Sequence, residues 1–372
     1  MIATTYPMKL SRNMIAMRRN ILCRRPFQGL YATATILAGF LAASALSPKE
    51  ALAQTGAAES AVVLVYQRFG EDDRPANSVK LSEFEAHITE LTSGKYNVMA
   101  LPDILAAIDK GEKLANRTVA ITIDDTFRSV YEKAWPRLKK AGLPFTLFVA
   151  TDQADLRRPA YMTWDEIREL RDGGVTIAAH TAAFLPVSEA TVEELRADAE
   201  RSLESFQREL GARPTLFAWP RGEMSSAASE MLTQLGFKAA FGYHSGSVSS
   251  LADRMMMPRF PMVGTYAKKA EFIMRVNTLA LPLTDVEPST PMLSGAAPTT
   301  FTFKIDSAAG RIRGFNCFHS SQGQLDLKEV GERRYEAALN SPGPKGIWRI
   351  NCTMPTGGKR FRWWGMQYYS AG

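Results

Sequence analysis

Two adjacent carboxylates, Asp124 and Asp125, are the residues whose type and position most clearly suggest chemistry. They are the last two residues of the segment 118–125, T-V-A-I-T-I-D-D. The β-branched and apolar residues at its start are typical of a strand buried on both faces. Neighbouring residues at the carboxyl end of such a strand point to opposite sides, at the edge where α/β folds place their chemistry. One carboxylate could bind a metal ion while the other acts as a base. The alternative is that Asp125 or Thr126 caps a following helix.

Further candidate residues follow two later predicted strands. The strand at residues 175–179 leads into His180, and the strand at 215–219 leads into the turn Pro220-Arg221-Gly222. Because parallel strands end at one edge of a sheet, a histidine and two aspartates there fit a catalytic cluster better than a structural role. An Asp/His pair with open positions suits Zn²⁺ or another divalent ion, which lowers the pKa of a bound water.

The elements that must position these side chains alternate between strand and helix from residue 61 onward. The predicted strands lie at residues 62–66, 96–101, 118–125, 145–150, 175–179, 215–219 and 238–242, and amphipathic helices separate most of them. This repetition predicts an α/β fold with a parallel sheet, and about seven strands are enough to close a barrel or nearly so. A doubly wound open sheet is the alternative, but no Gly-rich phosphate loop follows the first strand.

The C-terminal part has a different composition. Residues 282–299 are rich in Pro, Ser, Thr and Gly, which predicts a linker after a barrel spanning residues 61–281. Short strand patterns at 301–305, 311–318, 333–339, 346–353 and 360–369 then predict a small β domain over residues 300–372. Its aromatic residues could stack on sugars, but core packing is the commoner role; they are Trp348, Trp363, Trp364, Tyr368 and Tyr369.

The charge of the chain is concentrated at its start. The formal net charge is +7, and residues 1–53 hold seven Lys or Arg against one Glu, so the rest carries about +1. That balance gives no electrostatic reason to expect a nucleic-acid partner. The composition, 45% hydrophobic over 372 residues, supports one large domain plus a smaller one.

Residues 1–53 have the layout of a secretory signal peptide. A basic start ends at Arg24-Arg25, an apolar run covers residues 29–46, and Ala51-Leu52-Ala53 forms a small-residue cleavage site. We expect cleavage after Ala53 and a periplasmic or secreted protein without a stable membrane anchor. An uncleaved anchor is the alternative, and the moderately apolar run argues against it.

Cys317 and Cys352 are the two cysteines that remain after such cleavage. Two cysteines in an exported protein are more often paired than free, and by loop entropy such a disulfide adds roughly 3 to 4 kcal/mol of stability.

Residues 61–263 resemble the polysaccharide deacetylases, a family of metal-dependent carbohydrate esterases that includes the chitooligosaccharide deacetylases. Thr122-Ile123-Asp124-Asp125 resembles the family motif T-F-D-D, and His180-Thr181 begins its H-T-x-x-H motif. Residues 217–222, F-A-W-P-R-G, resemble a segment usually read F-A-Y-P-Y-G, and Met257-Pro258-Arg259-Phe260 resembles a later L-P-R-F.

The resemblance implies a distorted barrel of about seven strands that removes acetyl groups from N-acetylglucosamine units of a glycan. Asp124 would then be the general base, and Asp125 and His180 would bind the metal, with zinc expected. The backbone N–H of Arg221 would help to hold the oxyanion. The substrate-binding residues that it implies are Trp219, Pro220, Gly222 and Arg259.

Departures from the family pattern leave a second interpretation open. The second histidine of H-T-x-x-H is Phe184, and the family's Y-H-R-F reads Y-Q-R-F with Gln67. His244, Glu189 or the substrate could complete a metal shell that Asp125 and His180 only begin. The alternative function is an inactive or weakened relative that binds glycans or assists a partner enzyme.

Overall fold

The computed structural model describes residues 60–293, 298–339 and 345–371. The predicted signal peptide at 1–53 and its cleavage site lie outside the described residues.

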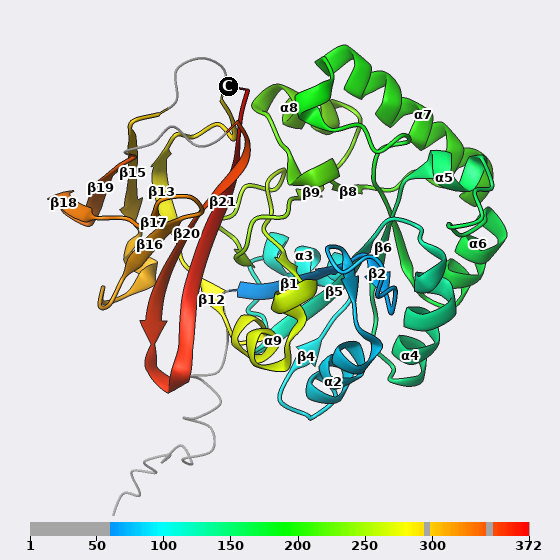
Figure 1. Ribbon diagram of the computed structural model, residues 1–372, viewed down its shortest axis with the longest axis horizontal. Coiled ribbons are helices and arrows are strands. Elements are labelled where there is room, and N and C mark those ends of the chain that lie inside the picture. Colours follow the sequence, from blue (N-terminus) through cyan, green and yellow to red (C-terminus); the bar gives the residue numbers. More distant parts are fainter. Residues whose placement is uncertain (1–59, 294–297, 340–344, 372) are drawn as a thin grey trace, which may run out of the picture. The chain divides into compact units, whose positions relative to one another are not determined.

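A curled, mainly parallel sheet forms the N-terminal part of the described chain (Figure 1). Its strands run in the order β10 (Ser247–Ser249), β1 (Ser60–Tyr66), β5 (Thr118–Asp124), β6 (Thr146–Val149), β7 (Thr176–Ala179), β8 (Leu216–Ala218) and β9 (Ala239–Phe241), with β4 (Asn97–Val98) beside β5. Only β10 is antiparallel to its neighbour. The predicted α/β barrel architecture is confirmed.

One short segment links the two edges of this sheet. Phe241 at the end of β9 pairs with Met257, and Leu64 of β1 pairs with Phe260 of β11 (Phe260–Pro261), both in parallel. Arg259 lies in the middle of this closing segment, so its position depends on both edges of the barrel.

Helices cover the outer face of the sheet (Figure 1). They are α2 (Leu81–Leu91), α3 (Leu101–Asp109), α4 (Trp135–Lys140), α5 (Thr151–Asp155), α6 (Trp164–Asp172), α7 (Val192–Leu210), α8 (Ser226–Gln234) and α9 (Lys269–Val276). In β5, Ile121 and Ile123 pack into the large helix-covered cluster, whereas Ala120 belongs to a separate cluster with Phe148 and Phe241. Because alternate residues of a strand share a face, Asp124 lies on the same side as Ala120, toward the barrel interior.

Ten strands form two sheets in the described part of the C-terminal region (Figure 1). One contains β12 (Leu279–Ala280), β14 (Met292–Leu293), β16 (Asn316–His319), β17 (Gly323–Gln324), β20 (Gly346–Thr356) and β21 (Arg360–Ser370). The other contains β13 (Leu283–Glu287), β15 (Thr300–Ile305), β18 (Leu327–Gly331) and β19 (Arg334–Ala338). The β-rich C-terminal region is therefore confirmed, and β13 and β14 lie within the segment that was predicted as a linker.

The two C-terminal sheets share a hydrophobic cluster. Phe301 and Phe303 of β15 meet Trp348 and Ile350 of β20 there, with Tyr368 of β21. Trp348 is 1% exposed and Tyr368 is fully buried, so these two aromatic residues are core rather than a sugar-stacking surface.

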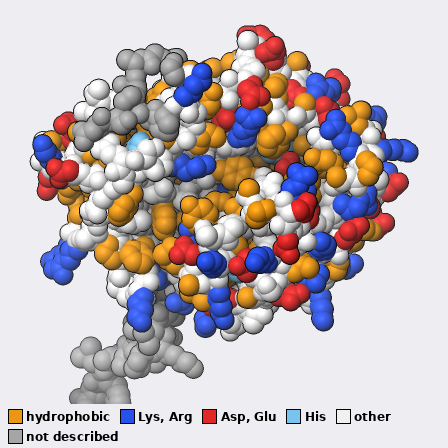
Figure 2. Space-filling model, in the orientation of Figure 1, with side chains coloured by type: hydrophobic (Ala, Val, Ile, Leu, Met, Phe, Trp, Pro, Cys, Tyr) orange, Lys and Arg blue, Asp and Glu red, His pale blue; other side chains and the backbone are white. Residues whose placement is uncertain are grey.

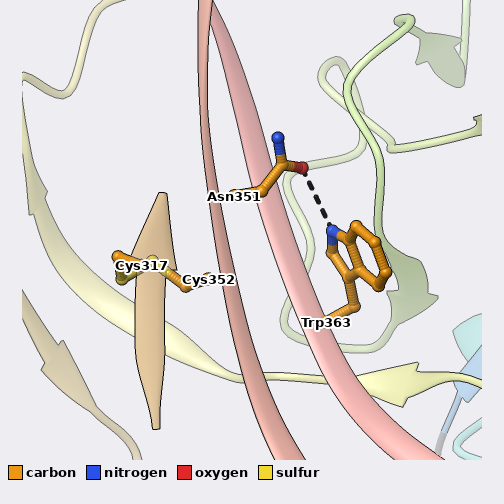
Figure 3. The surroundings of a disulfide bond; sticks show 4 residues. All are labelled: Cys317, Asn351, Cys352 and Trp363. Atoms are coloured by element: carbon orange, nitrogen blue, oxygen red, sulfur yellow. Dashed lines mark hydrogen bonds between the residues drawn. A yellow bond between two sulfur atoms is a disulfide. The ribbon is translucent and has the colours of Figure 1, made fainter. Parts of the chain in front are cut away.

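A disulfide joins Cys317 of β16 to Cys352 of β20, as the sequence predicted (Figure 3). The two residues are also paired across the antiparallel strands β16 and β20.

Within the described residues, no helix combines the length and apolar character needed to cross a bilayer. On the face that Figure 2 shows, Lys and Arg side chains are interspersed with Asp and Glu.

Candidate active site

Asp124 is the centre of a buried hydrogen-bond cluster at the end of β5. Its side chain is fully buried, and Arg259 approaches it with both terminal nitrogens, at 2.6 Å to Oδ1 and 2.8 Å to Oδ2. The hydroxyl of Tyr243 donates a further hydrogen bond to Oδ2 at 2.7 Å. Bidentate, charge-assisted bonds of this kind fix both the position and the orientation of a carboxylate.

Arg259 is itself held on three sides. Its Nε donates to the carbonyl of Gly242 at 3.0 Å, and Nη1 also reaches Thr122 Oγ1 at 3.2 Å. The side chain is completely buried. Sequence reasoning placed Arg259 among the substrate-binding residues, whereas the structure shows it as the partner of the Asp124 carboxylate.

Asp125 adopts a strained backbone conformation directly after the strand. Its φ is +67°, in the left-handed region, and its N–H donates to the carbonyl of Phe148 at 2.9 Å. Burial raises the pKa of Asp125 to about 8, and the charge of Asp124 adds to this rise. A bound cation would favour the ionised form and oppose both effects.

The helix-capping alternative for Asp125 and Thr126 is wrong. The helix begins at Arg128, and Thr126 Oγ1 has no hydrogen-bond partner within the described residues, nor does the Asp125 carboxylate accept a bond from the first turn there.

His180 follows β7 and is fully buried. Neither of its ring nitrogens makes a hydrogen bond of normal geometry within the described residues. Burial lowers the pKa of His180 to about 4, although the charge of Asp124 opposes the shift. A neutral imidazole with unpaired nitrogens has the chemistry of a metal ligand.

Phe184 stands where the family motif has its second histidine, and its ring packs edge-on against His180, with centroids 4.9 Å apart. His244 is held instead by a contact between Nε2 and the carbonyl of Met256 at 3.1 Å. The carboxylate of Glu189 is paired with the guanidinium of Arg221. Neither His244 nor Glu189 is therefore placed as a third metal ligand beside Asp125 and His180.

The donors present fit a divalent ion only in part. Asp125 and His180 supply an oxygen and a nitrogen, but within the described chain no three residues of the types His, Cys, Asp and Glu are grouped as metal ligands. Structural zinc sites use four protein ligands and catalytic ones three. A divalent ion bound here would depend on water or substrate for the rest of its coordination.

The turn after β8 is shaped by close packing. Arg221 has φ +53°, and its carbonyl accepts a hydrogen bond from Gln367 Nε2 of β21 at 2.8 Å. Gly222 has φ +68°, and a Cβ there would lie 2.6 Å from the backbone nitrogen of Tyr243, so only glycine fits. Pro220 is buried, and Trp219 is 1% exposed with Nε1 donating to the carbonyl of Met255.

Tyr243 was missed by sequence reasoning. It lies two residues beyond β9, at the same edge of the sheet as Asp124, and this strand-end position was the available signal. Gln67, noted only as a departure from the family pattern, donates to the Tyr243 hydroxyl at 2.8 Å. Both residues line a pocket of about 560 Å³.

Part of the chain matches a known protein family. Residues 111–240 match the family model of the polysaccharide deacetylases. The protein YxkH of Bacillus subtilis, named as a polysaccharide deacetylase, is 23% identical over 175 residues, which cover 46% of this chain and 62% of that protein. The poly-beta-1,6-N-acetyl-D-glucosamine N-deacetylase of Escherichia coli strain K12 is 24% identical over 232 residues, covering 51% of this chain and 34% of that protein.

The chain thus spans less than two thirds of the length of either relative. Among solved structures, the Streptococcus pyogenes deacetylase PplD in complex with acetate superposes with a TM-score of 0.55 at 18% identity, covering 58% of this chain and 98% of that chain. At this identity the likeness shows the fold. On the family match, the motifs and the fold together, the chain contains a domain of the polysaccharide deacetylase family.

Proposed function

We propose that this protein is an exported N-deacetylase that hydrolyses N-acetyl groups on amino-sugar polymers or oligomers that contain N-acetylglucosamine, with a divalent metal ion, zinc being the expected one. The observation that carries the proposal is the clamped carboxylate of Asp124, held by Arg259 and Tyr243 at the barrel edge where Asp125 and His180 also lie. The names of the relatives supply the class of substrate.

Each residue has a distinct role in the proposed reaction. Asp124 accepts a proton from the attacking water, and Arg259 keeps its carboxylate in position. Asp125 and His180 would hold the metal ion, which would supply Lewis acidity that makes water a better nucleophile. The backbone N–H of Arg221 stabilises the oxyanion, and the hydrogen bond from Gln367 to the Arg221 carbonyl fixes that peptide group.

Export is part of the same proposal. The sequence of residues 1–53 supports it through its signal-peptide layout, and the disulfide Cys317–Cys352 supports it because such bonds persist mainly in oxidising compartments.

Substitution of the base tests the proposed activity. Acetate released from β-1,6-linked N-acetylglucosamine oligomers is measured for the wild type and for Asp124→Asn. We expect the variant to lose about 10²- to 10⁴-fold in rate, the usual contribution of a general base. The matched control is Asp326→Asn, at an exposed carboxylate outside the site. Equal rates in Asp124→Asn and wild type would overturn the assignment, and oligomer binding without any acetate release would identify a glycan-binding relative instead.

A further inference from the structure

A pocket beside Asp124 is built jointly by the barrel and the C-terminal sheet. The barrel contributes Tyr243, which donates to the Asp124 carboxylate, and Gln67, which donates to the Tyr243 hydroxyl. The C-terminal sheet contributes alternate residues of β20. The lining residues from this sheet are Phe318, Arg349, Asn351, Thr353 and Trp363.

The disulfide stiffens the wall that β20 provides. Asn351 and Cys352 are consecutive on β20 and therefore point to opposite faces of the sheet. Figure 3 shows Asn351 and Trp363 pointing toward one another, with Trp363 Nε1 donating to Asn351 Oδ1 at 3.1 Å. The bond from Cys352 to Cys317 thus holds β16 and β20 together behind the pocket.

The charges that line this pocket are all positive. Arg275 and Arg349 are its charged residues, and neither Asp nor Glu is among the described residues that line it. Arg275 is neutralised by Glu271 on the same helix and lies between the rings of Tyr266 and Trp363, at 4.7 and 5.9 Å from their centroids.

Arg349 differs from Arg275 because its hydrogen-bond partner is neutral. Its Nη2 donates to the amide oxygen of Gln367 at 2.7 Å, and within the described residues it forms no ion pair with a carboxylate. Burial lowers the pKa of Arg349, because a charged guanidinium is less stable away from water. An anion bound in the pocket would offset that cost.

Besides these arginines, the pocket has aromatic side chains on which a sugar ring could stack. Tyr266 is 49% exposed and Phe318 is 41% exposed, which is unusual for large aromatic residues of this protein. Both line the pocket together with Trp363. Exposed aromatic rings that gather at a concave site mark a binding surface rather than random exposure.

We propose that this pocket is a glycan subsite that takes a sugar bearing an anionic group, with Arg349 as the residue that binds the anion. The inference rests on the proposed function in one respect, since it assigns the subsite to the same glycan that presents its acetyl group to Asp124. The favoured anion is a carboxylate, as in a uronic acid, because the guanidinium fork matches two carboxylate oxygens. A phosphate ester shares this chemistry.

Binding is tested on the full chain carrying Asp124→Asn, so that turnover does not interfere. The probes are a neutral N-acetylglucosamine tetramer, an alternating tetramer of glucuronic acid and N-acetylglucosamine, and a phosphorylated N-acetylglucosamine oligomer, each titrated by calorimetry. We expect the uronate tetramer to bind at least tenfold more tightly than the neutral one at low salt, with the preference shrinking as salt rises. Tighter binding of the phosphorylated probe than of the uronate would overturn the choice of carboxylate.

Substitution of Arg349 locates the effect. Arg349→Gln is expected to cut uronate binding by about 10- to 100-fold while leaving the neutral tetramer unchanged, because it removes one charged hydrogen-bond donor. Arg349→Lys keeps the charge and should retain part of the preference. The control, Arg313→Gln, removes an exposed arginine that does not line the pocket.

Two outcomes separate this proposal from the deacetylase assignment. Equal binding of acidic and neutral tetramers, or an unchanged preference in Arg349→Gln, would overturn the anionic subsite even if the wild type releases acetate. A preference that depends on Arg349, in a wild-type protein that releases no acetate, would sustain the subsite and refute the proposed activity.

Discussion

Among single residues, Phe184 is the one whose replacement by histidine should most change the affinity for metal. Its φ of +61° lies in the left-handed region, which histidine tolerates better than most residues, and its ring already contacts His180. We expect Phe184→His to raise zinc affinity by at least tenfold, since even indirect partners of a metal site are worth about 10- to 100-fold. Chelator competition measures the change.

The matched variant for this experiment is Phe184→Leu, which keeps an apolar side chain but adds no ligand. It should bind zinc as the wild type does. Equal zinc affinity in Phe184→His and Phe184→Leu would show that residue 184 does not face the metal position.

The positions of Asp124, Asp125 and His180 could be predicted from the sequence because each lies at the carboxyl end of a buried parallel strand. Their roles as base and metal ligands stay predictions. The sequence was less informative for Trp219 and Arg259, which the structure buries completely or nearly so. Their surroundings are set by the segment that joins β9 to β1, a contact between distant parts of the chain.

At the scale of elements, the close approach of β21 to the barrel depends on Gly365. A Cβ at this position would lie 2.3 Å from the carbonyl oxygen of Ser245 and 2.7 Å from Asn351 Oδ1. We expect Gly365→Ala to lower the free energy of unfolding by about 1 to 3 kcal/mol, as overpacking usually does, measured by urea denaturation.

Gly357 offers the control for that change. No atom lies within 4 Å of a Cβ added there, so Gly357→Ala should alter stability by no more than about 0.5 kcal/mol. If Gly365→Ala were equally harmless, β21 would not be packed against the barrel as described.

The barrel strands could be predicted because most are buried runs with clear turns between them; the predicted 62–66 corresponds to β1 at Ser60–Tyr66. The C-terminal strands were harder. β12 pairs with β21, whose residues lie about 80 positions later, and β14 pairs with β21 as well. The local composition of residues 282–299 indicated a linker. Strand pairing between residues so far apart in the chain leaves no signal in a short stretch of sequence.

At the scale of the whole described chain, the candidate site is shared between two parts that the sequence presents separately. Gln367 of β21 bonds to the Arg221 carbonyl, and Arg360 donates to the carbonyl of Asn277. Trp363 packs edge-on against Phe260 of the closing segment. No sequence pattern indicated that the C-terminal strands would reach the turn that carries the proposed oxyanion donor.

Acetate release during a zinc titration of chelator-treated protein tests whether this protein is a metal-dependent deacetylase. We expect no release without metal, recovery as zinc is added, and no recovery in Asp125→Asn, because asparagine tolerates φ of +67° but is a weaker ligand than a carboxylate. Release that is unaffected by the chelator, or absent at every zinc concentration, would contradict the assignment of a metal-dependent deacetylase.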